Sequence, residues 1–177
     1  MDMETIMNMM LQSGALEQVS GMLGVDDKSA VSAIETVMPM LLKGMQGQAT
    51  NANTQQGFMQ ALLDHSAEDT SDLKQAVKNV DVEDGAKIVN HLLGAQQQEE
   101  VAAKAIKKSG LDKKTILKIM AILAPILMSK MGKTAKAANA QASGSNSGTG
   151  DMLKVVSGLL DGVDAKDVVN ILGMLIK

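Results

Sequence analysis

The chain has 177 residues, of which 45% are hydrophobic, 21% are charged and one, Phe58, is aromatic, and its formal net charge is −3. This length and apolar content indicate one globular domain or two small ones and exclude wholesale disorder. The chain has no cysteine, which excludes disulfides, thiolate metal sites and cysteine nucleophiles, and its 17 basic residues are all lysine.

The first part of the chain predicts helices with clear ends. A helix over residues 16–23 should stop at Gly24, because glycine readily takes the left-handed conformation of a C-cap. Asp26 then offers a side-chain acceptor that can cap the next helix. From residue 28 to residue 45 apolar side chains recur at helical spacing, which predicts an amphipathic helix with one buried side.

The same signals return later in the chain. Asp84 is expected to be the N-cap of one helix, and a helix over residues 96–108 should end near Gly110. Asp112 should cap the helix that follows. Residues 116–131 of that helix are apolar nearly all round, so we expect other helices to cover it on most sides.

Two blocks of sequence occur twice in the same order. Residues 25–45 align without gaps on residues 111–131, and residues 73–94 align on residues 153–174. The first pair of blocks shares the identities Asp26/Asp112, Lys28/Lys114, Pro39/Pro125, Leu41/Leu127 and Met45/Met131. We interpret the blocks as an internal duplication; chance similarity between helical segments is the alternative.

The duplication predicts an all-α fold with two related helical repeats, over residues 1–94 and 95–177. The repeats are expected to pack, related by a pseudo-twofold axis, around proline-kinked central helices into one multi-helical bundle with one shared core. The kinks are expected at Pro39 and Pro125, the only two prolines. Residues 132–150, rich in glycine and serine, are predicted to form a flexible linker within the second repeat.

The order of several short motifs resembles a known family. The motifs are Met22-Leu23-Gly24-Val25, Pro39 to Leu42, Ala61 to His65, Asp84 to Gly94 and Ala124 to Leu127. In this order they resemble the YidB-like bacterial family (domain of unknown function 937), and the likeness covers most of the chain. The resemblance implies an all-helical bacterial protein, and it brings no activity, cofactor or catalytic residue.

The two histidines are the first candidates for chemistry. His65 lies beside Asp64, Glu68 and Asp69, a composition that superficially fits a metal or acid–base cluster. A catalytic zinc site takes three protein ligands, however, and His91 is far away in the sequence, in another helix. A protonated histidine is stabilised by the negative end of the helix dipole, and this alone explains why a histidine stands at position 65. We therefore predict no catalytic and no metal-binding residue.

Other motifs lead to the same conclusion. The chain has 15 methionines, and the spaced pairs Met7/Met9 and Met38/Met40 are of the kind that binds Cu(I), but core packing is the favoured interpretation. Residues 81–85 resemble the start of a calcium loop. The sixth and twelfth positions of such a loop need glycine and glutamate, but here they are Ala86 and Leu92. No glycine-rich segment carries the lysine of a phosphate loop. No cofactor and no cofactor-binding residue are predicted.

Charge is unevenly distributed along the chain. Residues 104–136 hold nine lysines and one acid, whereas residues 1–103 hold five lysines and 15 acids. Such a lysine-rich segment can bind a polyanion; the alternative is that its lysines solvate a pair of helices and attract the acidic first repeat. The absence of arginine and of aromatic stacking platforms argues against nucleic acid, and it leaves peripheral contact with an anionic membrane open.

The longest nearly uncharged stretch, residues 119–129, would span only about 16 Å as a helix, which is too short to cross a bilayer. The first ten residues do not have the pattern of a secretory signal. We therefore expect no transmembrane helix and a cytoplasmic location.

Together these features favour a non-enzymatic protein-interaction or scaffold module that binds a protein partner, or itself, through apolar helical surface. Two alternatives stay open. One is a lysine-mediated binder of nucleic acid or of an anionic membrane surface. The other is a carrier of a small apolar ligand in a cavity between the repeats.

Overall fold

The structure, a computed structural model, describes the backbone of residues 3–141 and the side chains of residues 8–137. Within this range the chain forms seven helices and no strand, which confirms the all-α prediction. In chain order the helices are α1 (Met3–Gln12), α2 (Ala15–Leu23), α3 (Asp27–Thr50), α4 (Gln55–His65), α5 (Leu73–Asn79), α6 (Val82–Ser109) and α7 (Lys113–Gln141).

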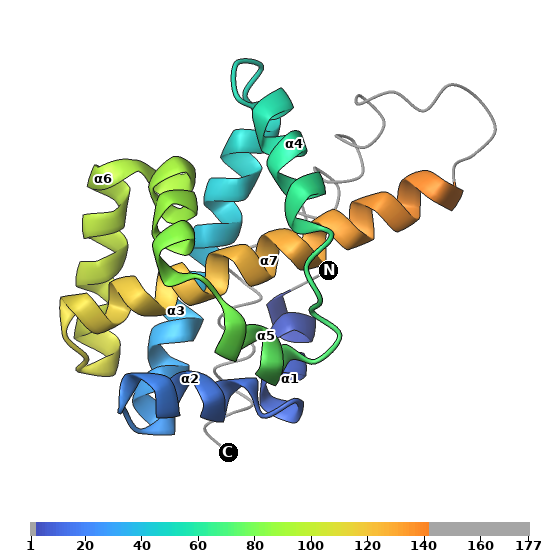
Figure 1. The fold of residues 1–177 in the computed structure, drawn as a ribbon. Helices are drawn as coiled ribbons and strands as arrows, with labels where there is room; N and C mark the ends of the chain where they lie inside the picture. Colours follow the sequence, from blue (N-terminus) through green and yellow to red (C-terminus); the bar gives the residue numbers. More distant parts are fainter. Residues whose placement is uncertain (1–2, 142–177) are drawn as a thin grey trace.

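Helix α7 runs through the middle of the described part of the molecule (Figure 1). It packs against α2, α3, α4, α5 and α6, as expected for a helix that is apolar nearly all round. Ile119 and Leu123 of α7 are at most 1% exposed, and so are Ile34, Met38 and Leu41 of α3. The two helices therefore contribute to one continuous core.

The contact between α3 and α7 agrees with one part of the predicted duplication, because these helices carry the aligned blocks with Pro39 and Pro125. Both prolines lie inside their helices. The second half of the aligned pair, residues 153–174, lies outside the described residues. The repeat, its pseudo-twofold axis and the proline kinks remain predictions.

Helix α7 is longer than residues 119–129, the nearly uncharged stretch that is too short to cross a bilayer. Among the described residues, only the segment Lys113–Ala137 is long and apolar enough to cross a membrane by length and composition. However, 78% of its most apolar window is buried inside the molecule. The apolar side chains of α7 thus face other helices of the same chain, as in the core helix of a globular domain.

The predicted helix ends are confirmed where glycine or aspartate was expected to define them. Gly24 and Gly110 have left-handed φ angles of 66° and 73° and end α2 and α6. The carboxylates of Asp26 and Asp112 each accept a hydrogen bond, 2.9 Å long, from the backbone N–H three residues later. Because these bonds stabilise the charged form, they lower the pKa of both carboxyl groups.

The prediction that Asp84 caps a helix is wrong. The cap of α6 is Asp81, whose Oδ1 accepts hydrogen bonds from the backbone N–H groups of Glu83 at 2.9 Å and Asp84 at 3.1 Å. Several acids follow one another here, and the helix begins after the first of them, so Asp84 falls in the first turn. There a negative charge is also favourable, because it faces the positive end of the helix dipole.

The predicted linker over residues 132–150 begins as helix instead. Helix α7 continues to Gln141, and the side chain of Ala135 is 1% exposed. The physical reason lies in the composition of residues 132–141, where alanine and lysine, both good helix formers, outnumber glycine and serine. The remaining part of the predicted linker lies outside the described residues.

Helix α6 consists of two legs that meet at Gly94, where the first predicted repeat ends. Gly94 has φ 68° and ψ 168°, a conformation that is essentially restricted to glycine. Figure 1 shows the legs folded back beside each other rather than as one rod. The first leg, residues 82–93, and the second leg, residues 95–109, therefore face different surroundings.

We expect Gly94→Ala to lower the free energy of unfolding by about 1–3 kcal/mol, because a Cβ atom is strained at this φ and ψ. Apart from its chain neighbours, no described residue has an atom within 4 Å of the position that the Cβ would occupy, so the loss would report backbone strain alone. The control is Gly47→Ala within α3, where there is equally open space and where alanine should stabilise the helix by about 0.5–1 kcal/mol. Urea unfolding of both variants checks this; equal effects would contradict it.

Two other glycines bring neighbouring helices against the backbone of α7. A Cβ atom at Gly85 of α6 would lie 1.8 Å from the carbonyl oxygen of Ala121. A Cβ atom at Gly132 of α7 would lie 2.1 Å from the carbonyl oxygen of Leu62 in α4. These close approaches set the positions of α4 and of the first leg of α6 over α7.

Candidate binding site

A pocket of about 450 Å³ lies between the end of α3, the helix α4 and the first leg of α6. Its floor is apolar and is formed by Phe58, Ala61, Ile88, Leu92 and Met128. The first two come from α4, the next two from α6 and the last from α7. The floor thus depends on the same approach of α4 and α6 to α7 that the two close glycines allow.

The hollow has a local cause in the sequence of α4. Gly57 and Ala61 lie one turn apart on this helix and both line the pocket, so the wall there carries almost no side-chain volume. Phe58 is the large residue next to them, and it is 7% exposed because it packs into the core cluster. Two small residues beside one large buried residue leave an open apolar concavity.

The rim of the pocket is polar and includes Gln48, Asn53, Thr54, Lys87 and His91. Gln48 Nε2 donates a hydrogen bond of 2.8 Å to the carbonyl oxygen of His91, which ties α3 to the first leg of α6. Thr54 Oγ1 donates to the carbonyl oxygen of Gln48 at 3.1 Å. These bonds fix the mouth of the pocket without using the side chains of Lys87 and His91.

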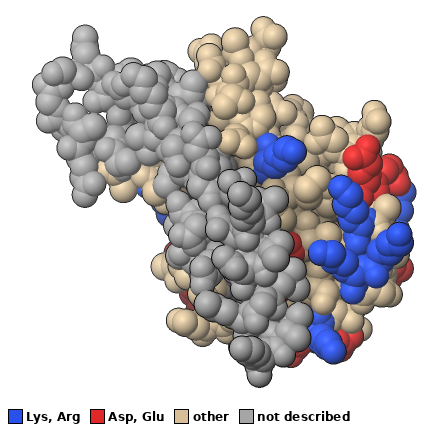
Figure 2. All heavy atoms as spheres, turned by 180° about the vertical axis from the view of Figure 1, so that it is seen from behind, with Lys and Arg blue, Asp and Glu red and all other residues tan. Residues whose placement is uncertain are grey.

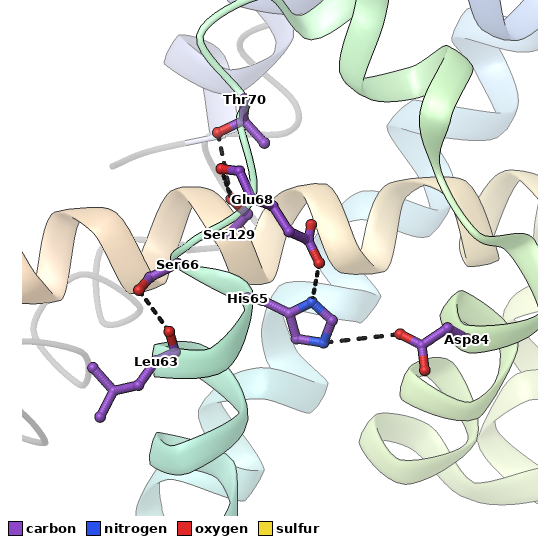
Figure 3. Close-up of polar contacts among 7 residues, drawn as sticks. All are labelled: Leu63, His65, Ser66, Glu68, Thr70, Asp84 and Ser129. Atoms are coloured by element: carbon purple, nitrogen blue, oxygen red, sulfur yellow. Dashed lines mark hydrogen bonds and ion pairs between the residues drawn. The ribbon is translucent and has the colours of Figure 1, made fainter.

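The structure does not bring the two histidines together. His91 lies on the rim of the pocket, whereas His65 ends α4 and lies between two carboxylates (Figure 3). His65 Nδ1 is 2.5 Å from Glu68 Oε1, and Nε2 is 4.0 Å from Asp84 Oδ2. The spacing in the sequence places Glu68 near His65, but nothing in it indicates Asp84, which approaches from another helix.

The acids near His65 do not form a metal centre. Glu68, Asp69, Asp81 and Asp84 line a second pocket of about 360 Å³ next to Pro125. In the described part of the chain, no group of three or more His, Cys, Asp or Glu side chains is arranged to hold a metal ion. Hydrogen bonds from the backbone N–H and the hydroxyl group of Ser71 to Asp69 lower the pKa of that carboxyl group. Its hydrogen-bond partners therefore lie within its own loop.

A buried polar contact fixes the loop between α4 and α5 on α7, and nothing in the sequence indicated it. Thr70 is 2% exposed and Ser129 of α7 is fully buried. Their hydroxyl oxygens are 3.4 Å apart, and Ser129 Oγ donates to the carbonyl oxygen of Glu68 at 3.4 Å (Figure 3). Lys133 Nζ also donates to Thr70 Oγ1 at 3.1 Å. Such partners satisfy hydroxyl groups that would be costly to bury alone.

Exposed lysines gather where the second leg of α6 meets the start of α7, as Figure 2 shows. We call this surface the lysine patch; its residues are Lys104, Lys107, Lys108, Lys114 and Lys118. The neighbouring Lys113 pairs with Glu99 at 2.5 Å. None of the patch lysines forms an ion pair with a described residue.

Burial raises the pKa of Glu35 of α3, and the charge of Lys108 opposes that rise.

The methionines whose side chains are described mostly pack the core. Met38, Met45 and Met120 are fully buried, and Met59 is 1% exposed. The sulfur atom of Met38, one of the residues considered for Cu(I), is therefore not accessible from the surface. In a core with a single aromatic residue, the flexible thioether side chains fill irregular spaces between helices.

Comparison with known proteins gives one result. A family model described as "Bacterial protein of unknown function (DUF937)" matches residues 5–134. No curated protein and no solved structure matches the chain. The matched range covers most of the seven described helices, including every residue of the pocket. The chain therefore belongs to the DUF937 family of bacterial proteins, as the order of its motifs indicated.

Proposed function

We propose that this protein is a non-enzymatic binding protein that takes a small apolar ligand in the pocket between α4 and α6. The observation that carries the proposal is the combination of an apolar floor with a polar rim. Concave sites of about 300–1,000 Å³ with apolar lining and few polar groups are typical of small-molecule pockets. The pocket of about 450 Å³ falls within that range.

The shape of the apolar surface favours a small ligand over a broad protein partner. Among the described residues, the large hydrophobic side chains that are exposed are Leu11 and Met22, at 41% and 42%. A helical face that docks a protein partner would present a contiguous apolar patch. Here the accessible apolar surface is concave, which supports the ligand-carrier alternative more than the scaffold alternative.

Straight-chain alcohols from butanol to octanol test the proposal. Each methylene group that enters the pocket should contribute about 0.8 kcal/mol, which is about a fourfold gain in affinity per added carbon. Isothermal titration of the full chain with each alcohol measures this series. An affinity that does not change with chain length would contradict the proposal.

The control variant for this series is Ala61→Trp, because it would fill the pocket from its α4 wall. Ala61 is only partly buried, so the larger side chain can extend into the open space of the pocket. We expect the variant to remain helical by circular dichroism and to lose binding of octanol. Unchanged binding would place the alcohol elsewhere on the protein.

The lysine patch supports a second candidate function, which is contact with an anionic membrane surface. Replacing Lys107, Lys108 and Lys114 with glutamine should abolish binding to vesicles that contain anionic lipid. The matched control replaces three exposed lysines outside the patch, which are Lys28, Lys43 and Lys78. Binding of the unmodified protein should weaken steeply between about 50 and 200 mM salt. Equal loss in both variants would contradict a role for the patch; tighter binding to duplex DNA would point to nucleic acid instead.

A further inference from the structure

We infer that the ligand of this pocket is an amphiphile with an alkyl chain and a carboxylate head group, the chemical class of fatty acids. The inference rests on the proposed function, since it assumes that the apolar floor holds a ligand. It adds the charge of the ligand and the residues that would recognise it. The observations that support it concern the rim of the pocket rather than its floor.

The one ammonium group among the residues that line the pocket belongs to Lys87. Lys87 and His91 lie one turn apart on the first leg of α6, both are exposed, and both line the pocket. Of the residues that the structure describes, no aspartate or glutamate lines it. Neither side chain forms an ion pair with a described residue, so the ammonium group of Lys87 faces the mouth of the pocket without a carboxylate partner.

The carboxylates of the same helix are used elsewhere. Asp84, one turn before Lys87, lies 4.0 Å from His65 Nε2 and lines the second pocket, as Figure 3 shows for its contact with His65. Asp81 caps the helix. At the start of this leg Asp81 and Asp84 therefore face the second pocket, whereas Lys87 and His91 face the apolar one.

A third unused donor comes from the opposite side of the mouth. Asn53, in the turn between α3 and α4, is exposed and lines the pocket, and among the described residues only its backbone N–H is bonded, to Asn51. Its side-chain amide can donate two hydrogen bonds, and His91 can donate from one ring nitrogen even when neutral. A single ammonium group with neutral donors around it suits a singly charged carboxylate. The apolar floor below suits the alkyl chain.

Three ligands with the same eight-carbon chain test the inference: octanoate, octanol and octylammonium. Isothermal titration of the full chain, below the concentrations at which the ligands aggregate, should rank octanoate first and octylammonium last. Lys87→Met removes the charge and keeps an unbranched apolar stem, so the floor stays intact. This variant should lose at least about threefold in affinity for octanoate and keep its affinity for octanol within about twofold. The matched control is Lys78→Met on α5, an exposed lysine outside the pocket, which should change neither affinity.

The outcomes separate the inference from the proposed function. If octanol and octanoate bind equally well and Lys87→Met changes neither, the carboxylate inference is wrong and the apolar pocket stands. If the two lysine variants weaken octanoate equally, general charge attraction explains the effect and the inference is also wrong. If none of the three ligands binds, as would happen if another part of the chain or a second copy fills the pocket, both the inference and the proposed function are wrong.

Discussion

Gly85→Ala should destabilise the protein by more than about 3 kcal/mol, at or above the upper end of the usual cost of overpacking. The new Cβ atom would lie 1.8 Å from the carbonyl oxygen of Ala121 and 2.7 Å from its carbonyl carbon. Both atoms belong to the backbone of α7, so no side-chain rotation can relieve the contact. Helix α6 must move away from α7, and the buried contacts between them are lost.

The control for this variant is Gly21→Ala in α2. Gly21 is also helical and exposed, and outside its own helix no atom in the described part of the chain lies within 4 Å of its Cβ position. Alanine there should raise stability by about 0.5–1 kcal/mol, because it removes the entropic cost of glycine in a helix. Urea unfolding of the two variants separates helix propensity from close packing. A Gly85→Ala variant as stable as the unmodified protein would mean that α6 and α7 are further apart than the structure shows.

Leu41→Ala and Leu127→Ala should each lower the free energy of unfolding by about 2–5 kcal/mol. Leu41 of α3 is 0% exposed and Leu127 of α7 is 2% exposed, so each truncation leaves a cavity in the shared core. Urea unfolding measures the loss. Because these two leucines are aligned in the predicted duplication, similar losses at both positions would be consistent with equivalent roles in the core.

The matched control is Leu11→Ala in α1, where the side chain is 41% exposed. This variant loses the same atoms, but much less of their surface is buried, so its cost should stay below about 1 kcal/mol. A loss at Leu127 as small as that at Leu11 would contradict the central position of α7.

Features that depend on local chemistry were predictable from the sequence. The glycines at 24 and 110 and the aspartates at 26 and 112 define helix ends through interactions that span only a few residues. The choice between Asp81 and Asp84 was not predictable in this way, because both can accept a hydrogen bond from the next turn. The extended backbone of Asp81, with φ −81° and ψ 104°, decides which of them is the cap.

Most features that depend on how helices meet could not be predicted. The spacing of apolar residues shows that the helix containing Ile119 is buried, and the predicted duplication pairs it with α3, but nothing in the sequence indicates that α4 also packs against it. Gly85 and Gly132 read as ordinary helical glycines until Ala121 and Leu62 are placed beside them. The pocket could not be predicted for the same reason, since α6 and α7 complete a wall that α3 and α4 begin much earlier in the sequence. The proximity of Asp84 to His65 also appears only in the folded chain.

The most direct test of the proposed function uses the methionines that the chain already contains. Met128 forms part of the pocket floor, whereas Met38 and Met45 are fully buried and do not line the pocket. NMR spectra of the full chain with ¹³C-labelled methionine methyl groups can follow all of them during a titration with octanol. We expect a saturable shift of the Met128 signal while those of Met38 and Met45 stay in place. A Met128 signal that does not move, or one that moves together with the core methionines, would contradict binding in this pocket.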